Sequence, residues 1–178
     1  MNVYEACMQR LELVFNEFDN ISVSFSGGKD SGLLLNLCIQ YILQNNLKRK
    51  ISVLHLDYEA QYELTSKYVS DMLTSNADIL DVYRVCVPFK VTTCTSMTQS
   101  YWRPWEGSKR NIWVSQMPKG AFTAAYFPFY NERMWDYEFQ ERFSQWLHER
   151  NKADRTAILV GIRTQESLNR WRAIHSDR

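Results

Sequence analysis

The run Ser24-Phe25-Ser26-Gly27-Gly28-Lys29-Asp30-Ser31 decides the fold, because it joins a short buried-strand pattern to a long helical one. Residues 21–25 predict a strand, whereas residues 32–43 carry apolar side chains at helical spacing. The run is therefore a turn that opens a helix, and its two glycines allow backbone conformations closed to other residues. Free N–H groups at the helix start, the helix dipole and the Lys29 ammonium all favour an anion, so the sequence predicts a phosphate site.

This run has two alternative interpretations. A Walker phosphate loop is excluded, because it needs four residues between its first glycine and a Gly-Lys-Ser/Thr. A tight turn without a ligand is the simpler alternative for Gly-Gly before a helix. The strand-turn-helix setting favours the phosphate site over the plain turn.

Composition predicts one domain over residues 1–178 and limits its partners. The chain has 21 basic and 20 acidic residues, so charge gives no case for nucleic acid or an anionic membrane. No stretch approaches the length needed to cross a bilayer, and we expect a soluble cytoplasmic protein. The four cysteines lack zinc-type or iron–sulfur spacing; Cys38 and Cys86 are predicted to be small buried hydrophobes, and Cys94 is kept as a weak candidate for chemistry.

Strand and helix patterns alternate along most of the chain. Strands are predicted at 21–25, 51–56, 79–87 and 156–162, and helices at 3–18, 32–43, 62–73, 134–149 and from 165 toward 174. This order predicts an α/β fold with an open, mostly parallel sheet of about four or five strands and helices on both faces, as in Rossmann-like proteins.

Residues 88–133 interrupt this alternation. They contain all four prolines and three of the six tryptophans, and their spacing fits neither helix nor strand. We expect this insertion to fold over the ligand crevice and to line a site for an acceptor or a protein partner. The alternative is that its aromatic residues cover an edge of the sheet.

Further candidate residues follow the second and fourth predicted strands. Ligands of open parallel sheets gather at the carboxyl ends of the strands, which places Asp57 at the same crevice as the glycine turn. Gly161 permits close approach, Arg163 stands at a strand end, and Arg170 lies two helical turns later on the same face. The alternatives are that Asp57 only begins a loop and caps a helix, and that the arginines form a solvated basic face.

Three sets of residues carry a resemblance to a known family. The glycine turn resembles the SGGxDS pyrophosphate loop of the adenine-nucleotide alpha-hydrolase (PP-loop) superfamily, with its Ser, Asp and Ser positions filled. The run Gly161-Ile162-Arg163-Thr164-Gln165-Glu166-Ser167 and the arginine at 170 resemble the second nucleotide motif of phosphoadenosine phosphosulfate (PAPS) reductase-like proteins. The resemblance extends to three further runs, at residues 57–62, 113–118 and 126–130. Together these motifs make the chain similar to the IbrA-like (immunoglobulin-binding regulator) branch of that family.

The resemblance implies an adenine-nucleotide site. Phosphates would be held by the turn, Asp57 would meet the adenosine, and Arg163 and Arg170 would close on a remaining anionic group. Gly161 would permit the close approach of the nucleotide. The residues implied in the phosphate turn are Ser26, Gly27, Gly28, Lys29, Asp30 and Ser31.

The chain also departs from the reductases of this family. It lacks their C-terminal Glu-Cys-Gly-Leu-His segment and the clustered cysteines of iron–sulfur reductases, and Asp57-Tyr58-Glu59 replaces their Asp-Thr-Gly motif. We therefore expect the N-terminal part of a longer protein, with an unidentified catalytic residue.

Three functions remain open at this point. The first is an oxidoreductase-type enzyme of sulfur metabolism that acts on or binds PAPS or a related sulfonucleotide. The second is an ATP pyrophosphatase that forms AMP, which would need Mg²⁺ near Asp30. The third is a regulator that binds the nucleotide without chemistry.

Overall fold

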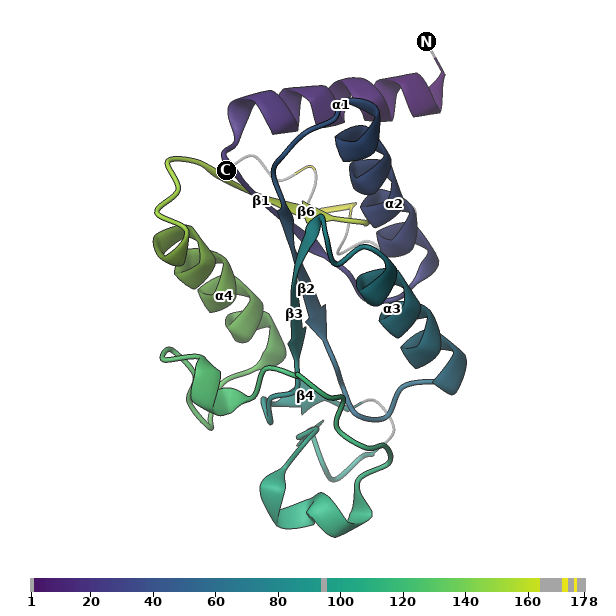
Figure 1. Ribbon diagram of the computed structural model, residues 1–178. Coiled ribbons are helices and arrows are strands. Elements are labelled where there is room, and N and C mark those ends of the chain that lie inside the picture. The colour runs from purple at the N-terminus through teal and green to yellow at the C-terminus, as the bar shows by residue number, and fades with distance from the viewer. Residues whose placement is uncertain (1, 94–95, 164–170, 173–174, 176–178) are drawn as a thin grey trace.

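A four-stranded parallel sheet forms the centre of the computed structural model, which describes residues 2–93, 96–163, 171–172 and 175. The strand order is β3-β2-β1-β6 (Figure 1). The strands are β1 (Asn20–Ser24), β2 (Ile51–Leu56), β3 (Leu80–Val85) and β6 (Thr156–Val160). The predicted α/β fold with an open, mostly parallel sheet of about four or five strands is confirmed, with four strands in the sheet.

Helices cover both faces of this sheet. In Figure 1, α2 (Lys29–Gln44) and α3 (Glu63–Ser75) lie on one side of the strands and α4 (Asp136–Arg150) on the other, while α1 (Val3–Glu17) crosses the upper end. Alternate residues of β2 serve the two cores: Ile51 and Val53 pack toward α2 and α3, whereas Leu54 and Leu56 pack toward α4. All six residues of β2 are buried, as a central strand of a parallel sheet requires.

The order of the strands creates a switch point beside β1. The chain leaves β1 through α2 to reach β2 on one side, whereas β6 pairs with β1 on the other side. The chain therefore moves from β1 to one side of the sheet to form β2, and it returns past β1 to the other side to form β6. The carboxyl ends of strands at such a point leave a crevice that open α/β sheets use for ligands.

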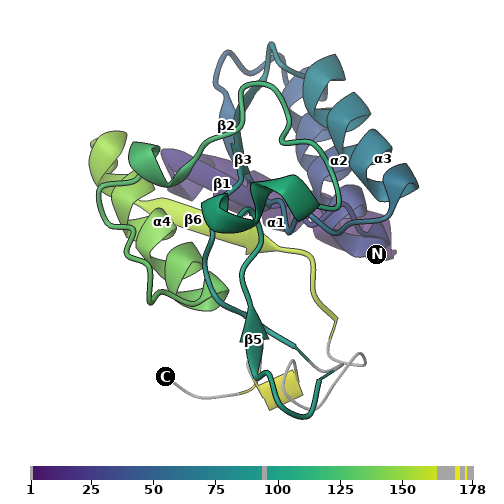
Figure 2. The same ribbon diagram turned by 90° about the horizontal axis from the view of Figure 1, so that it is seen from below.

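Residues 88–133 hold short elements rather than a lid over that crevice. The elements are β4 (Val91–Thr92), β5 (Tyr101–Trp102), η1 (Gly107–Ile112) and η2 (Ala124–Tyr126). Phe122 bridges to Val85, donating its N–H to the carbonyl of Arg84, and Phe127 packs against α4. Seen from below in Figure 2, the segment lies across the ends of β2 and β3. Residues 120–129 thus cover the edge of β3, in agreement with the alternative that the aromatic residues of the insertion cover a sheet edge.

Other predicted elements have the expected bounds to within a few residues, and some predictions concern residues outside the described part of the chain. The strand predicted at 156–162 ends at Val160, and the helix predicted at 134–149 spans Asp136–Arg150. Cys38 and Cys86 are buried, as predicted. The helix predicted from 165 lies mostly outside the described residues, as do Cys94 and Arg170.

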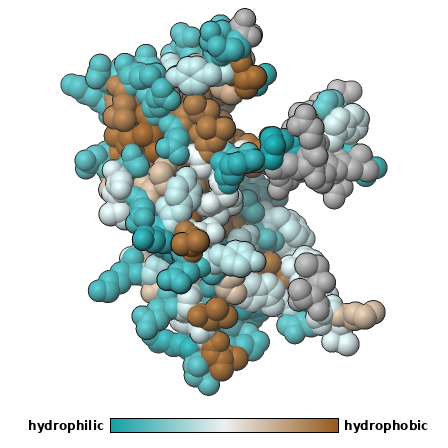
Figure 3. Space-filling model, turned by 90° about the vertical axis from the view of Figure 1, so that its right-hand side faces the viewer, coloured by the Kyte–Doolittle hydropathy of each residue, from teal (hydrophilic) through white to brown (hydrophobic). Residues whose placement is uncertain are grey.

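The surface on the side of α2 and α3 is mainly hydrophilic, with brown apolar patches that are larger in its upper part (Figure 3). Among the described residues, no helix has the length and apolar character that crossing a membrane would take.

Candidate functional site

The glycine turn forms the start of α2 and is held by its own hydroxyl groups. Ser26 Oγ lies 2.9 Å from Ser31 Oγ, and Ser31 Oγ donates to the carbonyl of Gly28 at 3.1 Å. Gly28 is the N-cap residue, and within the described residues no side chain caps the helix. The first N–H groups of α2 are therefore presented at the end of the turn, as an anion site requires.

Two glycines near this turn are required by packing. Gly27 has φ of +81°, and a Cβ there would lie 2.6 Å from a methyl carbon of Val69 on α3. A Cβ on Gly161 would lie 2.8 Å from backbone atoms of Asp30 and Ser31. The close approach that Gly161 permits is therefore between the end of β6 and the first turn of α2.

A cavity of about 260 Å³ opens beside this turn, at the carboxyl ends of β1, β2 and β6. Its lining consists of Ser24, Phe25, Ser26, Ser31, Leu54, Leu56, Tyr58, Gln61, Gln140, Val160, Gly161 and Ile162. None of these twelve residues is charged. The volume is below the roughly 300–1,000 Å³ of pockets that enclose a whole drug-sized ligand, so the cavity suits one part of a nucleotide.

Charged groups stand at the turn and at the end of β6. Lys29 is exposed at the first position of α2, and the guanidinium of Arg163 donates from Nε to Asp30 Oδ2 at 3.1 Å. The structure thus brings together the turn, Gly161 and Arg163, as the sequence predicted. Asp30, whose carboxylate is the expected ligand for Mg²⁺, is thus in an ion pair with Arg163.

Asp30 is a single carboxylate at the start of α2, and a Mg²⁺ ion held there would need further oxygen ligands from the phosphates of the nucleotide and from water. Asp30 already accepts from Arg163, and the described part of the chain holds no group of three or more His, Cys, Asp or Glu residues that could share a metal ion.

Asp57 lies at the predicted edge of the sheet, but its side chain turns away from the cavity. Asp57 Oδ2 accepts from Arg84 Nη2 at 2.8 Å and from Arg84 Nε at 3.0 Å, and Oδ1 accepts from the N–H of Glu59. Only 5% of the Asp57 side chain is exposed. Both carboxylate oxygens are thus committed to a buried ion pair and a turn, and Asp57 is absent from the cavity lining. The helix-cap alternative does not hold either, since the N-cap of α3 is Tyr62.

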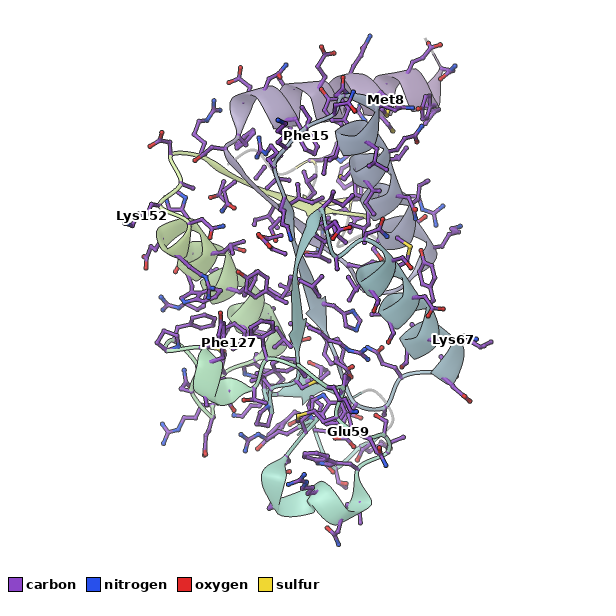
Figure 4. The ribbon with its side chains drawn as sticks, in the orientation of Figure 1. Met8, Phe15, Glu59, Lys67, Phe127 and Lys152 are labelled. Atoms are coloured by element: carbon purple, nitrogen blue, oxygen red, sulfur yellow. The ribbon has the colours of Figure 1, made fainter. Side chains whose placement is uncertain are left out.

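Glu59 ties residues 88–133 to the end of β2. Its carboxylate accepts from the N–H of Trp105 at 2.7 Å and from the N–H of Val114 at 2.9 Å. The Trp105 indole N–H donates to the carbonyl of Asp57 at 2.6 Å. Figure 4 shows Glu59 among the side chains below the sheet, and Trp105 is only 3% exposed. No described residue of the insertion lines the cavity, so the expectation of a lid over the crevice is corrected.

Sequence reasoning missed Tyr58, Gln61 and Gln140 at the cavity. The Tyr58 hydroxyl donates to Asp136 at the start of α4, and burial, helped by that carboxylate, raises the pKa of the phenol. Tyr58 and Gln61 follow β2 directly, and the position of Asp57 was the signal that could have drawn attention to them. Gln140 had no signal, because it reaches the cavity from α4 across the sheet.

The described cysteines do not reach this cavity. Cys38 and Cys86 are buried, and burial raises the pKa of the Cys38 thiol to about 12. Burial also raises the pKa of the Cys86 thiol. Neither thiol is therefore a ready nucleophile near neutral pH.

Comparison with known proteins gives one informative similarity. No family model matches the chain. The chain is 36% identical over 178 residues to a protein of Escherichia coli strain K12 named "Uncharacterized protein YbdN". The match covers 99% of this chain but 42% of that protein, so the chain spans less than half the length of its relative.

Proposed function

We propose that this chain is the adenine-nucleotide-binding domain of a PAPS reductase-like protein, and that it binds or acts on PAPS or a related sulfonucleotide. One observation carries the proposal: an uncharged cavity at the switch point of the sheet adjoins a glycine turn that opens α2. The cavity suits a base, and the turn with Lys29 suits phosphate.

The resemblance of the turn and of residues 161–167 to PP-loop proteins supports the same assignment. Arg163 stands where an anionic group at the far end of the ligand would meet it. The pair with Asp30 is half-exposed, with 51% of the Arg163 side chain accessible, and such pairs contribute little.

The positions of the buried cysteines favour a second candidate function for the same nucleotide site. Because neither buried thiol reaches the cavity, the described residues bind the nucleotide without supplying a thiol nucleophile. A nucleotide-binding regulator is the function that needs no such group. The ATP pyrophosphatase candidate would require Asp30, which is paired with Arg163, to hold Mg²⁺ together with the phosphates of ATP. Exposed Ile112 and Val114 in the insertion offer a surface for a partner or acceptor.

Calorimetric titration with PAPS, ATP and adenosine 3′,5′-bisphosphate, each with and without Mg²⁺, tests the proposal. We expect PAPS and the bisphosphate to bind without Mg²⁺, and to bind more tightly than ATP. Tight binding of ATP only with Mg²⁺ would favour the pyrophosphatase instead. Failure of all three nucleotides to bind would overturn nucleotide recognition.

A further inference from the structure

Gln61 has an unusual hydrogen-bonding state among the residues that line the cavity. Its amide Nε2 donates to the carbonyl of Leu56 at 3.5 Å, the outer limit for a hydrogen bond. Its Oε1 is shielded from solvent and has no hydrogen-bond partner among the described residues. Buried polar atoms are nearly always paired, so an unpaired amide oxygen on a residue that lines the cavity calls for an explanation.

The neighbouring carbonyl favours one orientation of the amide. With Nε2 facing the carbonyl of Leu56, Oε1 is left as an acceptor, and the amide cannot be reversed without setting two acceptors against each other. The terminal torsion of a glutamine is broad, so the amide can turn toward a donor that enters the cavity while staying near Leu56. The wall of the cavity after β2 thus offers acceptors.

The chemical complement of such a wall is an amino group on a flat, uncharged ring. An exocyclic amine of a base has two N–H donors, whereas an oxo group at the same position would face Oε1 with a lone pair. The apolar walls given by Leu54 and Leu56, with the ring of Tyr58, suit the faces of a planar ring.

We propose that Gln61 is the specificity-determining residue for the base, and that it selects a 6-aminopurine by accepting a hydrogen bond from the exocyclic amine. The inference rests on the proposed function, since it assumes that a nucleotide occupies the turn and the cavity. It names the residue that makes this site an adenine site, which neither the glycine turn nor Arg163 can do.

Two ligands that differ only in the amine provide the test: adenosine 5′-monophosphate and purine riboside 5′-monophosphate, which has hydrogen at position 6. We expect the wild-type chain to bind the first about tenfold more tightly in calorimetry, the worth of roughly one hydrogen bond. Gln61→Leu should bring that ratio close to one, by weakening only the adenosine compound. Gln44→Leu, which removes an exposed amide at the end of α2 outside the cavity, is the matched control and should leave the ratio near tenfold. Gln140→Leu tests the other amide of the cavity itself.

The outcomes separate this inference from the function on which it rests. A wild-type ratio near one, or a ratio that Gln61→Leu leaves unchanged, would overturn the role of Gln61 while nucleotide binding stands. A ratio abolished by Gln140→Leu and kept by Gln61→Leu would assign the selection to α4. If the folded wild-type chain binds neither compound, the proposed function and this inference are both overturned.

Discussion

Lys29 is the first residue of α2, and its ammonium is exposed above a turn whose hydroxyl groups bond to one another. Lys29→Ala should weaken nucleotide binding by about 1.5–3 kcal/mol, roughly ten- to hundredfold, because a charge-assisted hydrogen bond to phosphate is lost. Calorimetry measures this change, and the melting temperature should stay the same. Lys67→Ala is the control, since Lys67 is exposed on α3 and points away from the molecule (Figure 4). Equal affinities for the wild type and Lys29→Ala would remove the lysine from the phosphate site.

The carboxylate of Asp57 is expected to stabilise the fold through its pair with Arg84 and not to bind the nucleotide. Asp57→Ala leaves Arg84 partly buried without its counter-ion, and breaking such a pair costs about 3–5 kcal/mol. Urea denaturation should therefore show a large loss in the free energy of unfolding, with nucleotide affinity retained at temperatures where the variant is folded. Asp81→Ala is the control on β3, because Asp81 pairs with Lys50 at 3.9 Å on the exposed surface. A variant of normal stability that has lost nucleotide binding would return Asp57 to the site.

At the scale of elements, the end of β2 holds the insertion in place through one side chain. Glu59→Ala removes the acceptor for the N–H groups of Trp105 and Val114, each of which costs about 1–3 kcal/mol if left buried and unpaired. Trypsin should then cut faster after Lys109 and Arg110 in η1, while far-ultraviolet circular dichroism stays close to that of the wild type.

The control for this prediction is Glu63→Ala, which removes an exposed carboxylate four residues further along the chain, at the start of α3. It should leave the cleavage rate unchanged. A cleavage rate for Glu59→Ala equal to that of the control would mean that other contacts hold the insertion.

At the scale of the whole molecule, the parts that were predictable from sequence are those set by local pattern. The strand predicted at 51–56 is β2, and the glycine turn opens α2 as expected. Both follow from the period of apolar residues and from a turn that only glycine allows at Gly27. The same reasoning placed Arg163 beside that turn, because parallel strands end at one edge.

What could not be predicted depends on contacts between distant residues. Asp57 was expected at the edge of the sheet, and it lies there, but its partner Arg84 is 27 residues away and draws the carboxylate from the cavity. The apolar side chains around Phe127 signalled burial without saying whether they cover the crevice or the edge of β3. Gln140 reaches the cavity only because α4 crosses the other face of the sheet.

The stability of the molecule as a whole should depend on the protonation of His55. Its ring is fully buried on β2; Nδ1 lies 2.7 Å from the carbonyl of Phe25 and so carries the proton, while Nε2 has no partner among the described residues. Burial lowers the pKa of this imidazole below 6.5, with Arg84 acting in the same direction. The folded state therefore keeps His55 neutral, whereas the unfolded chain takes up a proton near pH 6.5.

Since the unfolded state then binds more protons, the free energy of unfolding should fall as the pH decreases below about 6.5, by at most about 1.4 kcal/mol per pH unit for this one group. Above that pH the contribution of His55 is constant. His55→Asn keeps an N–H for the carbonyl of Phe25 but does not titrate, so urea denaturation across this range should show a shallower pH dependence for the variant. The carboxylates contribute to both proteins and cancel in the comparison. Identical slopes for the two proteins would show that the buried imidazole is protonated in the folded state as readily as in the unfolded chain.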